Sequence, residues 1–297
     1  MPPPAQHFVA PPGWEWWILA YFFLGGLSGG SYAIGTLLRL FGTDADQRAA
    51  RIAFIVSFLA LVPCPILLIL DLGQPLRFLN MLFDMSEGGL VFKLWSPMSV
   101  GAWALLVYGL FSFGSFLGAI AESGWHAADP VARLLRGTVG AVWNVIGTAF
   151  GLFICAYTGV LLAVSNQPVW SDGWPLGGLF LASSLTGAAA LLLLLGRWRR
   201  DVDAGTEVRL ARADRSFAIL EAVLLVAFVV TVAIAGTIGR MLGVWLLLWL
   251  VVIAGLAAPF LLSRFDGAGR WAPVTAPVLA LLGLLALRAV VIFSAQT

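Results

Sequence analysis

Long apolar stretches alternate with short polar connections along almost the whole chain. A helix needs about 20 residues to cross a hydrocarbon layer of ~30 Å, and eight stretches reach that length. Because the bilayer interior offers no water to pair with backbone groups, such stretches are expected to be α-helical. The predicted spans are residues 16–40, 50–70, 95–121, 138–164, 175–196, 216–236, 242–263 and 273–294. The pattern predicts an all-α membrane protein, an eight-transmembrane-helix bundle made of two four-helix groups.

Composition supports a membrane protein built as one transmembrane domain over residues 1–297. Apolar residues make up 61% of the chain, charged residues 11%, and the mean hydropathy is +0.96, well outside the range of soluble globular chains. Residues 1–15 form a proline-rich stretch without Lys or Arg, so it lacks the basic start of a secretory signal peptide. We expect this stretch to remain as an arm on the outer side.

The distribution of positive charge predicts an orientation. Thirteen of the seventeen Lys and Arg residues lie near the connections after spans 1, 3, 5 and 7. Basic connections stay in the cytoplasm, so both termini are predicted to face the periplasmic, outer side. The thirteen are Arg39, Arg48, Arg51, Arg133, Arg136, Arg197, Arg199, Arg200, Arg209, Arg212, Arg215, Arg264 and Arg270.

Three ionisable residues fall at membrane depth, where a charge costs at least ~2.5 kcal/mol and needs a partner or a function. Asp71 ends span 2 and is expected either to form a helix-end salt bridge with Arg77 or to act chemically. Glu221 in span 6 could pair with Arg215 or belong to a proton path. Arg288 in span 8 requires an acidic or carbonyl partner.

Polar and aromatic residues also gather at the outer level of several spans. Pro63 and Pro65 interrupt the hydrogen-bond ladder of span 2, so a kink should open space towards the outer face. A flat ligand with carbonyl oxygens needs stacking surfaces and a few hydrogen-bonding groups, a description that a quinone fits. The candidates around Asp71 are Trp17 and Tyr21 in span 1, Asn80 after span 2, Ser96 and Met98 opening span 3, and Tyr157 and Asn166 near the end of span 4.

The residues that are scarce exclude several cofactors in this chain. His7 and His126 both lie outside the predicted spans, so no pair of membrane-embedded imidazoles can hold a b-type haem. Cys64 and Cys155 are isolated, which excludes an iron–sulfur cluster, a disulfide framework and a Cys-x-x-Cys metal site. No nucleotide-binding loop appears, and no nucleic acid is expected as a partner. If the chain takes part in redox chemistry, electrons must pass through another subunit.

Four stretches together resemble the NrfD/PsrC family, the membrane subunits of the polysulfide reductase type. They are YFFLGGLSGG at residues 21–30, DLGQPLRF at 71–78, SPMS at 96–99 and RAVV at 288–291. The glycines of the first stretch also form G-x-x-x-G patterns, which favour close helix packing. With eight spans, the resemblance covers most of the chain.

The resemblance implies a quinone site, for menaquinone or ubiquinone, at the outer face of a bacterial or archaeal cytoplasmic membrane. It also implies a docked ferredoxin-like subunit with [4Fe-4S] clusters and a catalytic subunit that often carries a molybdopterin cofactor. Carried over by position, Asp71 would serve quinone protonation and Tyr157 would hydrogen-bond a quinone carbonyl. Arg77 and Phe78 belong to the same motif and join the cofactor-binding candidates. Some family members are expected to use a histidine in span 1, where this chain has Trp17 and Tyr21.

Two other functions remain open at this point. The chain could be a passive anchor that ties a soluble oxidoreductase to the lipid membrane, with the polar cluster as a docking surface. It could also translocate protons along a route that includes Asp71, Glu221 and Arg288. Such a route would need polar groups at mid-membrane, where the sequence offers only hydroxyls such as Ser57 and Thr148.

Overall fold

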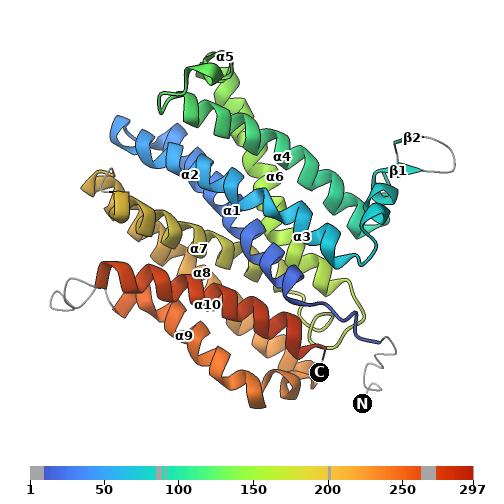
Figure 1. Ribbon diagram of the computed structural model, residues 1–297. Helices are drawn as coiled ribbons and strands as arrows, with labels where there is room; N and C mark the ends of the chain where they lie inside the picture. Colours follow the sequence, from blue (N-terminus) through green and yellow to red (C-terminus); the bar gives the residue numbers. More distant parts are fainter. Residues whose placement is uncertain (1–9, 85–88, 91, 200–201, 262–271, 297) are drawn as a thin grey trace.

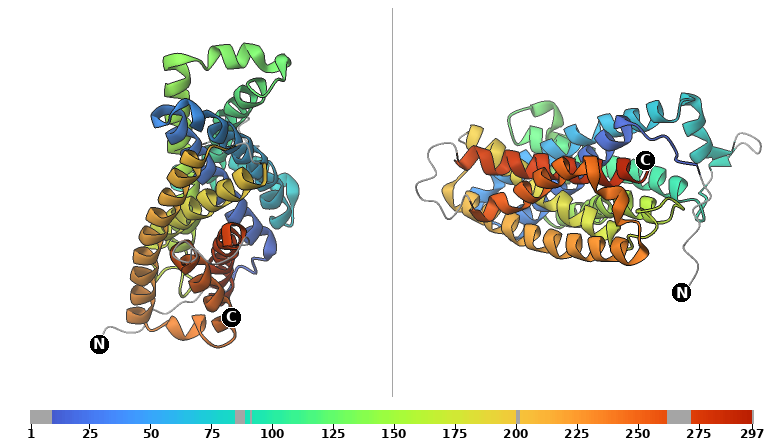
Figure 2. Two further views of the ribbon diagram at one scale, coloured as in Figure 1. Left: turned by 90° about the vertical axis from the view of Figure 1, so that its left-hand side faces the viewer. Right: turned by 90° about the horizontal axis from the view of Figure 1, so that it is seen from below.

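The computed structural model describes residues 10–84, 89–90, 92–199, 202–261 and 272–296 (Figure 1). Within them, eight helical segments are long and apolar enough to cross a bilayer, in agreement with the eight predicted spans. These segments run lengthwise beside one another, as the right-hand view of Figure 2 shows. The chain is therefore a multi-pass membrane protein with an almost entirely helical fold.

The described elements follow one another as α1 (Trp16–Phe41), η1 (Asp44–Asp46), α2 (Gln47–Leu61), α3 (Pro63–Asp71), η2 (Pro75–Met81), β1 (Phe83–Asp84), β2 (Gly89–Leu90), α4 (Pro97–Ala121), η3 (His126–Ala128), α5 (Asp129–Leu134), α6 (Gly137–Ala163), α7 (Leu176–Arg199), α8 (Ala204–Ala235), η4 (Ile238–Met241), η5 (Gly243–Trp245), α9 (Leu246–Leu261) and α10 (Ala272–Ser294). The η elements are 3₁₀ turns, and η1, α2 and α3 together form the second span.

Helices α1 and α7 form the centre of the bundle. Over an apolar stretch of 18 residues in each helix, 78% of the residues in α1 and 72% in α7 are buried. The corresponding values are 28% in α8 and 22% in the span that contains α9. Helix α1 contacts α2, α3, α6, α7 and α10. Its glycines permit this, because a Cβ on Gly29 would overlap the carbonyl of Gly151, and one on Gly30 would press on the carbonyl of Ser184.

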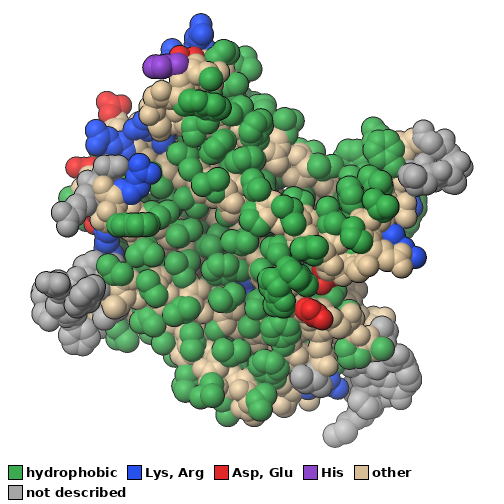
Figure 3. Space-filling view, viewed as in Figure 1, with side chains coloured by type: hydrophobic (Ala, Val, Ile, Leu, Met, Phe, Trp, Pro, Cys, Tyr) green, Lys and Arg blue, Asp and Glu red, His purple; other side chains and the backbone are tan. Residues whose placement is uncertain are grey.

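The two ends of the bundle differ in charge. At one end, which we call the termini end, the start of α1 meets the end of α10, and the Trp14 backbone N–H donates to the Gln296 side chain at 2.7 Å. Lys and Arg side chains gather at the opposite end, the arginine-rich end (Figure 3). Between the two ends the surface in that view is mainly apolar, as a lipid-facing belt requires.

A buried carboxylate joins two distant segments at the arginine-rich end. Asp46 of η1 is fully buried and accepts hydrogen bonds from Thr206 and Arg209 at the start of α8, both at 2.6 Å. Helix α8 consequently begins at Ala204, whereas hydropathy alone placed the start of this span at residue 216. The additional turns carry charged residues, which a criterion based on apolar runs leaves out.

The second span is interrupted at the predicted place. Helix α2 ends at Leu61 and α3 begins at Pro63, because Pro63 and Pro65 have no N–H to continue the ladder. Helix α3 ends at Asp71, two residues before Gly73, whose φ of +61° suits a residue without a side chain. The following turn η2 and the small β1–β2 hairpin, which the sequence did not predict, lead the chain back to α4.

Candidate functional site

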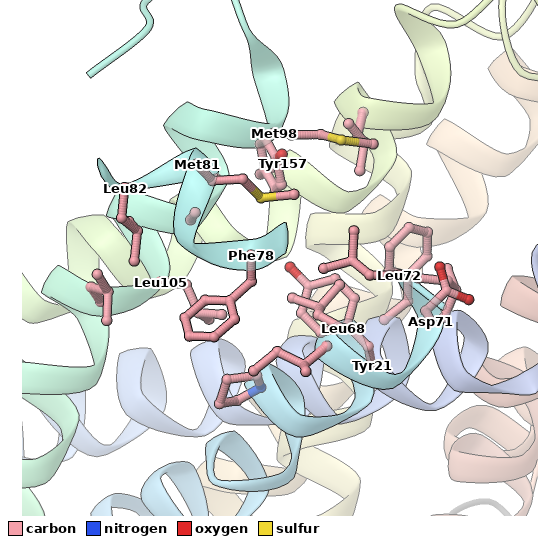
Figure 4. A pocket seen from close by; sticks show the side chains of 18 of the residues that line it. Tyr21, Leu68, Asp71, Leu72, Phe78, Met81, Leu82, Met98, Leu105 and Tyr157 are labelled. Atoms are coloured by element: carbon pink, nitrogen blue, oxygen red, sulfur yellow. The ribbon is translucent and has the colours of Figure 1, made fainter. Parts of the chain in front are cut away.

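A cavity of about 200 Å³ lies at the termini end, between α1, α3, α4 and α6 and against η2 (Figure 4). Its walls are mainly apolar. The kink between α2 and α3 contributes to it, because Pro65 and the residues after it form one wall. The lining residues are Trp14, Ile18, Tyr21, Phe22, Pro65, Leu68, Ile69, Asp71, Leu72, Phe78, Met81, Leu82, Met98, Gly101, Ala102, Leu105, Leu106, Tyr157 and Leu161.

Asp71 supplies a carboxylate to the cavity from the last residue of α3. The side chain is only partly buried, and Glu15 lies close enough to interact with it electrostatically. The predicted salt bridge with Arg77 is wrong, because no ion pair among the described residues includes Asp71. Arg77 is exposed on η2. Within the described part of the chain, the carboxylate is therefore not engaged by a structural partner.

Tyr157 of α6 is held by a hydrogen bond across to α4. Its hydroxyl donates to the Pro97 carbonyl at 2.6 Å, and its ring stacks on Phe153 with centroids 5.6 Å apart. Gly101 makes this approach possible, since a Cβ there would overlap the tyrosine ring and its oxygen. Because the Tyr157 hydroxyl proton is donated to the Pro97 carbonyl, the Tyr157 oxygen can act towards a ligand only as a hydrogen-bond acceptor.

Tyr21 of α1 brings a second phenol to the same cavity. Tyr21 is only 2% exposed, and its side chain lies beside Leu72 and Phe78 in the wall of the cavity (Figure 4). Among the described residues, no hydrogen bond engages its hydroxyl. A buried phenol without such a partner is suited to donate to a carbonyl oxygen of a ligand.

The SPMS stretch fixes the turn that covers the cavity. Ser96 caps α4 by accepting from the Ser99 backbone N–H at 3.4 Å, and the Ser99 hydroxyl donates to the Met81 carbonyl at 3.1 Å. Turn η2 is thereby held against the start of α4, with Phe78 and Met81 facing the cavity. The Ser96 side chain therefore stabilises the start of α4 and is not part of the cavity lining.

The structure brings together five of the predicted site residues, namely Tyr21, Asp71, Phe78, Met98 and Tyr157. The other predicted ones outside the lining are Trp17, Arg77, Asn80, Ser96, Asn166, Glu221 and Arg288. Sequence reasoning missed Ile18 and Trp14, which lie three and seven residues before Tyr21. Helical spacing from Tyr21 would have indicated Ile18, whereas Trp14 precedes the start of α1 at Trp16. Trp14 stacks on Trp170, with ring centroids 5.0 Å apart, and lines the cavity.

Arg288 is completely buried and ties three helices together. Its Nε donates to the Phe22 carbonyl at 3.1 Å, and its two Nη atoms donate to Ser183 and Ser184 at 3.1 and 2.8 Å. Its guanidinium also lies over the Phe180 ring, 4.9 Å from the centroid. A carbonyl partner was one of the two expected for this residue. Because Phe22 lines the cavity, Arg288 fixes the wall next to Tyr21.

Glu221 of α8 is 6% exposed and lies outside the cavity lining. Thr186 and Arg288 are near enough to interact with its carboxylate. The predicted local pair with Arg215 is absent from the ion pairs of the described residues. The reason is geometric, since Glu221 faces α7 and the bundle interior.

Comparison with known proteins places this arrangement in a family context. The sequence matches the family described as "Polysulphide reductase, NrfD" over residues 8–297. Protein NrfD of Escherichia coli (strain K12) is 27% identical to the chain over 308 aligned residues, covering 95% of each protein. A selenate reductase subunit from Mesobacillus selenatarsenatis is 28% identical over 95 residues, which cover 32% of this chain and 20% of that protein.

Proposed function

Because the chain belongs to the polysulphide reductase NrfD family, we propose that it is the quinone-binding membrane subunit of a multi-subunit respiratory oxidoreductase. One observation carries this proposal: an apolar cavity that receives one carboxylate and two phenols from three different helices. Its volume of about 200 Å³ is below the ~300–1,000 Å³ of pockets that enclose a whole drug-sized ligand. A quinone ring fits such a space while its long apolar tail extends into the lipid.

The polar groups of the cavity have complementary roles in this proposal. A bound quinone supplies two-electron, two-proton redox chemistry. The Tyr21 hydroxyl is the donor available to a carbonyl oxygen, whereas the Tyr157 oxygen accepts from a ligand hydroxyl. The Asp71 carboxylate takes up or returns a proton at one of its oxygens. Phe78 and Met81 exclude water above the ring.

Electrons reach the cavity from a partner in this scheme. The chain's two cysteines lie singly in α3 and α6, so they cannot together hold an iron–sulfur cluster. We infer that the clusters belong to a ferredoxin-like subunit with [4Fe-4S] clusters, which docks at the termini end because the cavity lies there. The catalytic subunit beyond it, of the molybdopterin type, would determine the terminal substrate. The positive-inside rule assigns the arginine-rich end to the cytoplasm and the termini end to the periplasm.

The orientation is testable with single cysteines, because the native Cys64 and Cys155 are fully buried and give little background. Asn166→Cys lies in the connection between α6 and α7 at the termini end, and Gly205→Cys lies at the arginine-rich end. An impermeant maleimide added to intact cells should label only Asn166→Cys. Labelling of Gly205→Cys alone would reverse the assigned orientation.

The quinone site itself is tested by Asp71→Asn, which keeps the shape of the side chain and removes its charge. In the complex with its native partner subunits, quinone-linked turnover should fall at least a hundredfold while the subunits still co-purify. Asp44→Asn, an exposed carboxylate at the arginine-rich end, is the matched control and should behave as wild type. Full activity of Asp71→Asn would remove this residue from the mechanism.

A passive anchor is the function to be distinguished from this proposal. It requires no quinone, so extraction of the purified complex should yield no bound quinone, and quinol-site inhibitors should have no effect. A passive anchor does not require a carboxylate and two phenols in the lining of an apolar cavity.

A further inference from the structure

A second cavity, of about 280 Å³, lies at the arginine-rich end, and we call it the arginine-end cavity. Residues of α1, α2, α4, α5 and α6 line it, so it is formed between helices. It shares no lining residue with the proposed quinone cavity. In contrast to that cavity, its lining contains two positively charged side chains, Arg39 and Arg136. Any ligand it binds is therefore independent of the quinone function.

The charged residues of this lining lie at the ends of membrane spans. Arg39 is in the last turn of α1, Glu122 directly follows α4, and Arg136 directly precedes α6. Lipid headgroups lie at the depth where spans end, so these side chains are at headgroup level. Asn144 lines a deeper part, because its Cα lies about 10 Å along α6 from the start of that helix. The cavity therefore extends from the headgroup layer towards the hydrocarbon layer.

Asn144 brings a hydrogen-bond donor to the deeper part of the cavity. The residue is 9% exposed, and its side-chain oxygen accepts from the Ser115 hydroxyl at 3.2 Å. No hydrogen bond among the described residues engages its side-chain nitrogen. Buried polar groups nearly always have a partner, because a buried donor without one is costly. The Asn144 amide nitrogen is therefore available to an oxygen atom of a ligand in the cavity.

The first turn of α6 adds backbone donors nearer the surface. Gly137 and Gly140 line the cavity, and neither has a side chain to cover the backbone. The N-cap residue is Arg136, and no side chain caps this helix end. The first N–H groups of a helix have no partner within it, and the helix dipole gives this end a partial positive charge. Such an end attracts anions, phosphate groups among them.

The two arginines differ in whether their charge is already neutralised. Arg39 forms an ion pair with Glu122 at 2.9 Å and lies over the Phe54 ring, 5.9 Å from its centroid. Arg51 also reaches Glu122, because it donates to the backbone carbonyl of that residue at 2.6 Å. The Arg136 guanidinium, in contrast, has no ion pair or hydrogen bond with any described residue. The lining consequently carries a net positive charge.

The donors lie at two depths, which fits a phospholipid better than a free phosphate ion. A guanidinium and a helix N-terminus bind phosphate oxygens, and here both are at headgroup level. The Asn144 amide lies deeper, and its side chain leans towards the start of the helix. In a phospholipid the ester carbonyls lie a few ångströms below the phosphate, so one carbonyl oxygen can accept from this amide. A free phosphate ion would reach only the shallower donors.

We propose that the arginine-end cavity binds one anionic phospholipid, with its phosphate at Arg136 and the start of α6 and an ester carbonyl at Asn144. The net positive charge selects a lipid of the phosphatidylglycerol class over phosphatidylcholine, because the choline cation is repelled by an arginine without a partner. Basic pockets between membrane helices recognise anionic headgroups in the same way. The bound lipid joins the ends of α1, α4 and α6 and therefore stabilises the folded protein.

The experiment uses the purified full chain, with the subunits that co-purify, in a neutral detergent after its lipids have been washed away. Dioleoyl phosphatidylglycerol, dioleoyl phosphatidylcholine and inorganic phosphate are titrated separately at constant ionic strength. Unfolding on heating is followed with a thiol-reactive dye, since Cys64 and Cys155 are buried. Phosphatidylglycerol should raise the unfolding temperature until it saturates, with half-saturation at a concentration about tenfold lower than for phosphatidylcholine. Inorganic phosphate in large excess should have no such effect.

Arg136→Gln removes the cation that has no protein partner. It should raise the half-saturating concentration of phosphatidylglycerol about tenfold and leave the unfolding temperature without lipid unchanged. Asn144→Asp keeps the acceptor for Ser115 but replaces the donor nitrogen by an oxygen, so it should also weaken phosphatidylglycerol binding. Arg133→Gln is the matched control and should bind the lipid as wild type does. It removes the same charge from the same connection, but Arg133 is outside the lining and its Nε donates to the Asp129 carbonyl.

Four results would overturn the proposal. Equal half-saturation by the two lipids in the wild-type protein would show that the site does not select anionic headgroups. Equal losses in Arg136→Gln and Arg133→Gln would indicate general attraction to a basic surface. Unchanged binding in both Arg136→Gln and Asn144→Asp would place the lipid elsewhere on the protein. Stabilisation by inorganic phosphate, with no further effect of phosphatidylglycerol, would assign the cavity to a soluble anion.

Discussion

The two phenols of the cavity provide a sharp test, because their hydrogen bonding differs while their chemistry is the same. Tyr157 already donates to the Pro97 carbonyl at 2.6 Å, whereas the Tyr21 hydroxyl has no hydrogen-bond partner among the described residues. Tyr21→Phe should therefore leave the free energy of unfolding unchanged within ~0.5 kcal/mol. Tyr157→Phe should lower it by about 1 kcal/mol, the usual value of one intramolecular hydrogen bond.

The affinity for oxidised quinone should depend on Tyr21 rather than on Tyr157. Tyr21→Phe removes the donor available to a quinone carbonyl, so oxidised quinone should bind about tenfold more weakly, which corresponds to ~1.4 kcal/mol. Tyr157→Phe should leave the affinity for oxidised quinone near the wild-type value, because the Tyr157 proton is engaged by Pro97. It should weaken binding of the quinol, whose hydroxyl needs the Tyr157 oxygen as an acceptor.

Binding of menadione and menadiol can be followed by quenching of tryptophan fluorescence, since Trp14 lines the cavity. Unfolding can be followed by heating in detergent with a thiol-reactive dye, because both cysteines are buried. The reasoning would be refuted if Tyr157→Phe weakened menadione binding tenfold while Tyr21→Phe had no effect. In that case the Tyr157 proton would have to leave Pro97 when the ligand binds.

Three further predictions concern the architecture around the cavity. Asp46→Ala should destabilise the protein by about 1–3 kcal/mol, because it leaves the buried Thr206 hydroxyl without its acceptor and the half-exposed Arg209 without its partner, whereas the exposed Asp44→Ala should have little effect in the same thermal assay. Arg288→Lys should lower the free energy of unfolding by about 1–2 kcal/mol, since an ammonium cannot reach Phe22, Ser183 and Ser184 together; an unchanged unfolding temperature would contradict the role of its planar group. Gly101→Ala should displace the Tyr157 ring and reduce quinol binding more than Gly109→Ala, whose Cβ would meet only ordinary contacts on the same helix; equal binding by the two variants would show that the Tyr157 position is not needed.

Several parts of the site could be predicted from the sequence because they depend on local chemistry. Pro63 and Pro65 lack backbone N–H groups wherever they occur in a helix, so the break in the second span follows from residue type. Gly73 and Pro75, which follow Asp71, likewise end that span through their backbone chemistry. The choice of Tyr21 and Tyr157 as partners of Asp71 rested on their common depth, and the structure places all three around one cavity.

Other site features could not be predicted because they depend on how helices are rotated about their axes. Depth along a span says nothing about direction, so Trp17 and Tyr21 were equal candidates, and only Tyr21 lines the cavity. Arg77 was expected to pair with Asp71, but η2 turns it outward. The hydroxyls of Ser28, Ser57, Tyr108 and Ser112 were visible as single polar residues, with no sign that they meet.

The sequence by itself determined the number of membrane spans and the break in the second one, because the thickness of the hydrocarbon layer and the backbone chemistry of proline and glycine act on short segments of chain. Only the tertiary structure decided which side chains share the cavity and which buried hydroxyls meet between helices. The physical reason is that contacts between helices depend on close packing at specific glycines, such as Gly29 against Gly151 and Gly101 against Tyr157. Those approaches fix the rotation of each helix, and the rotation determines which face meets a neighbour.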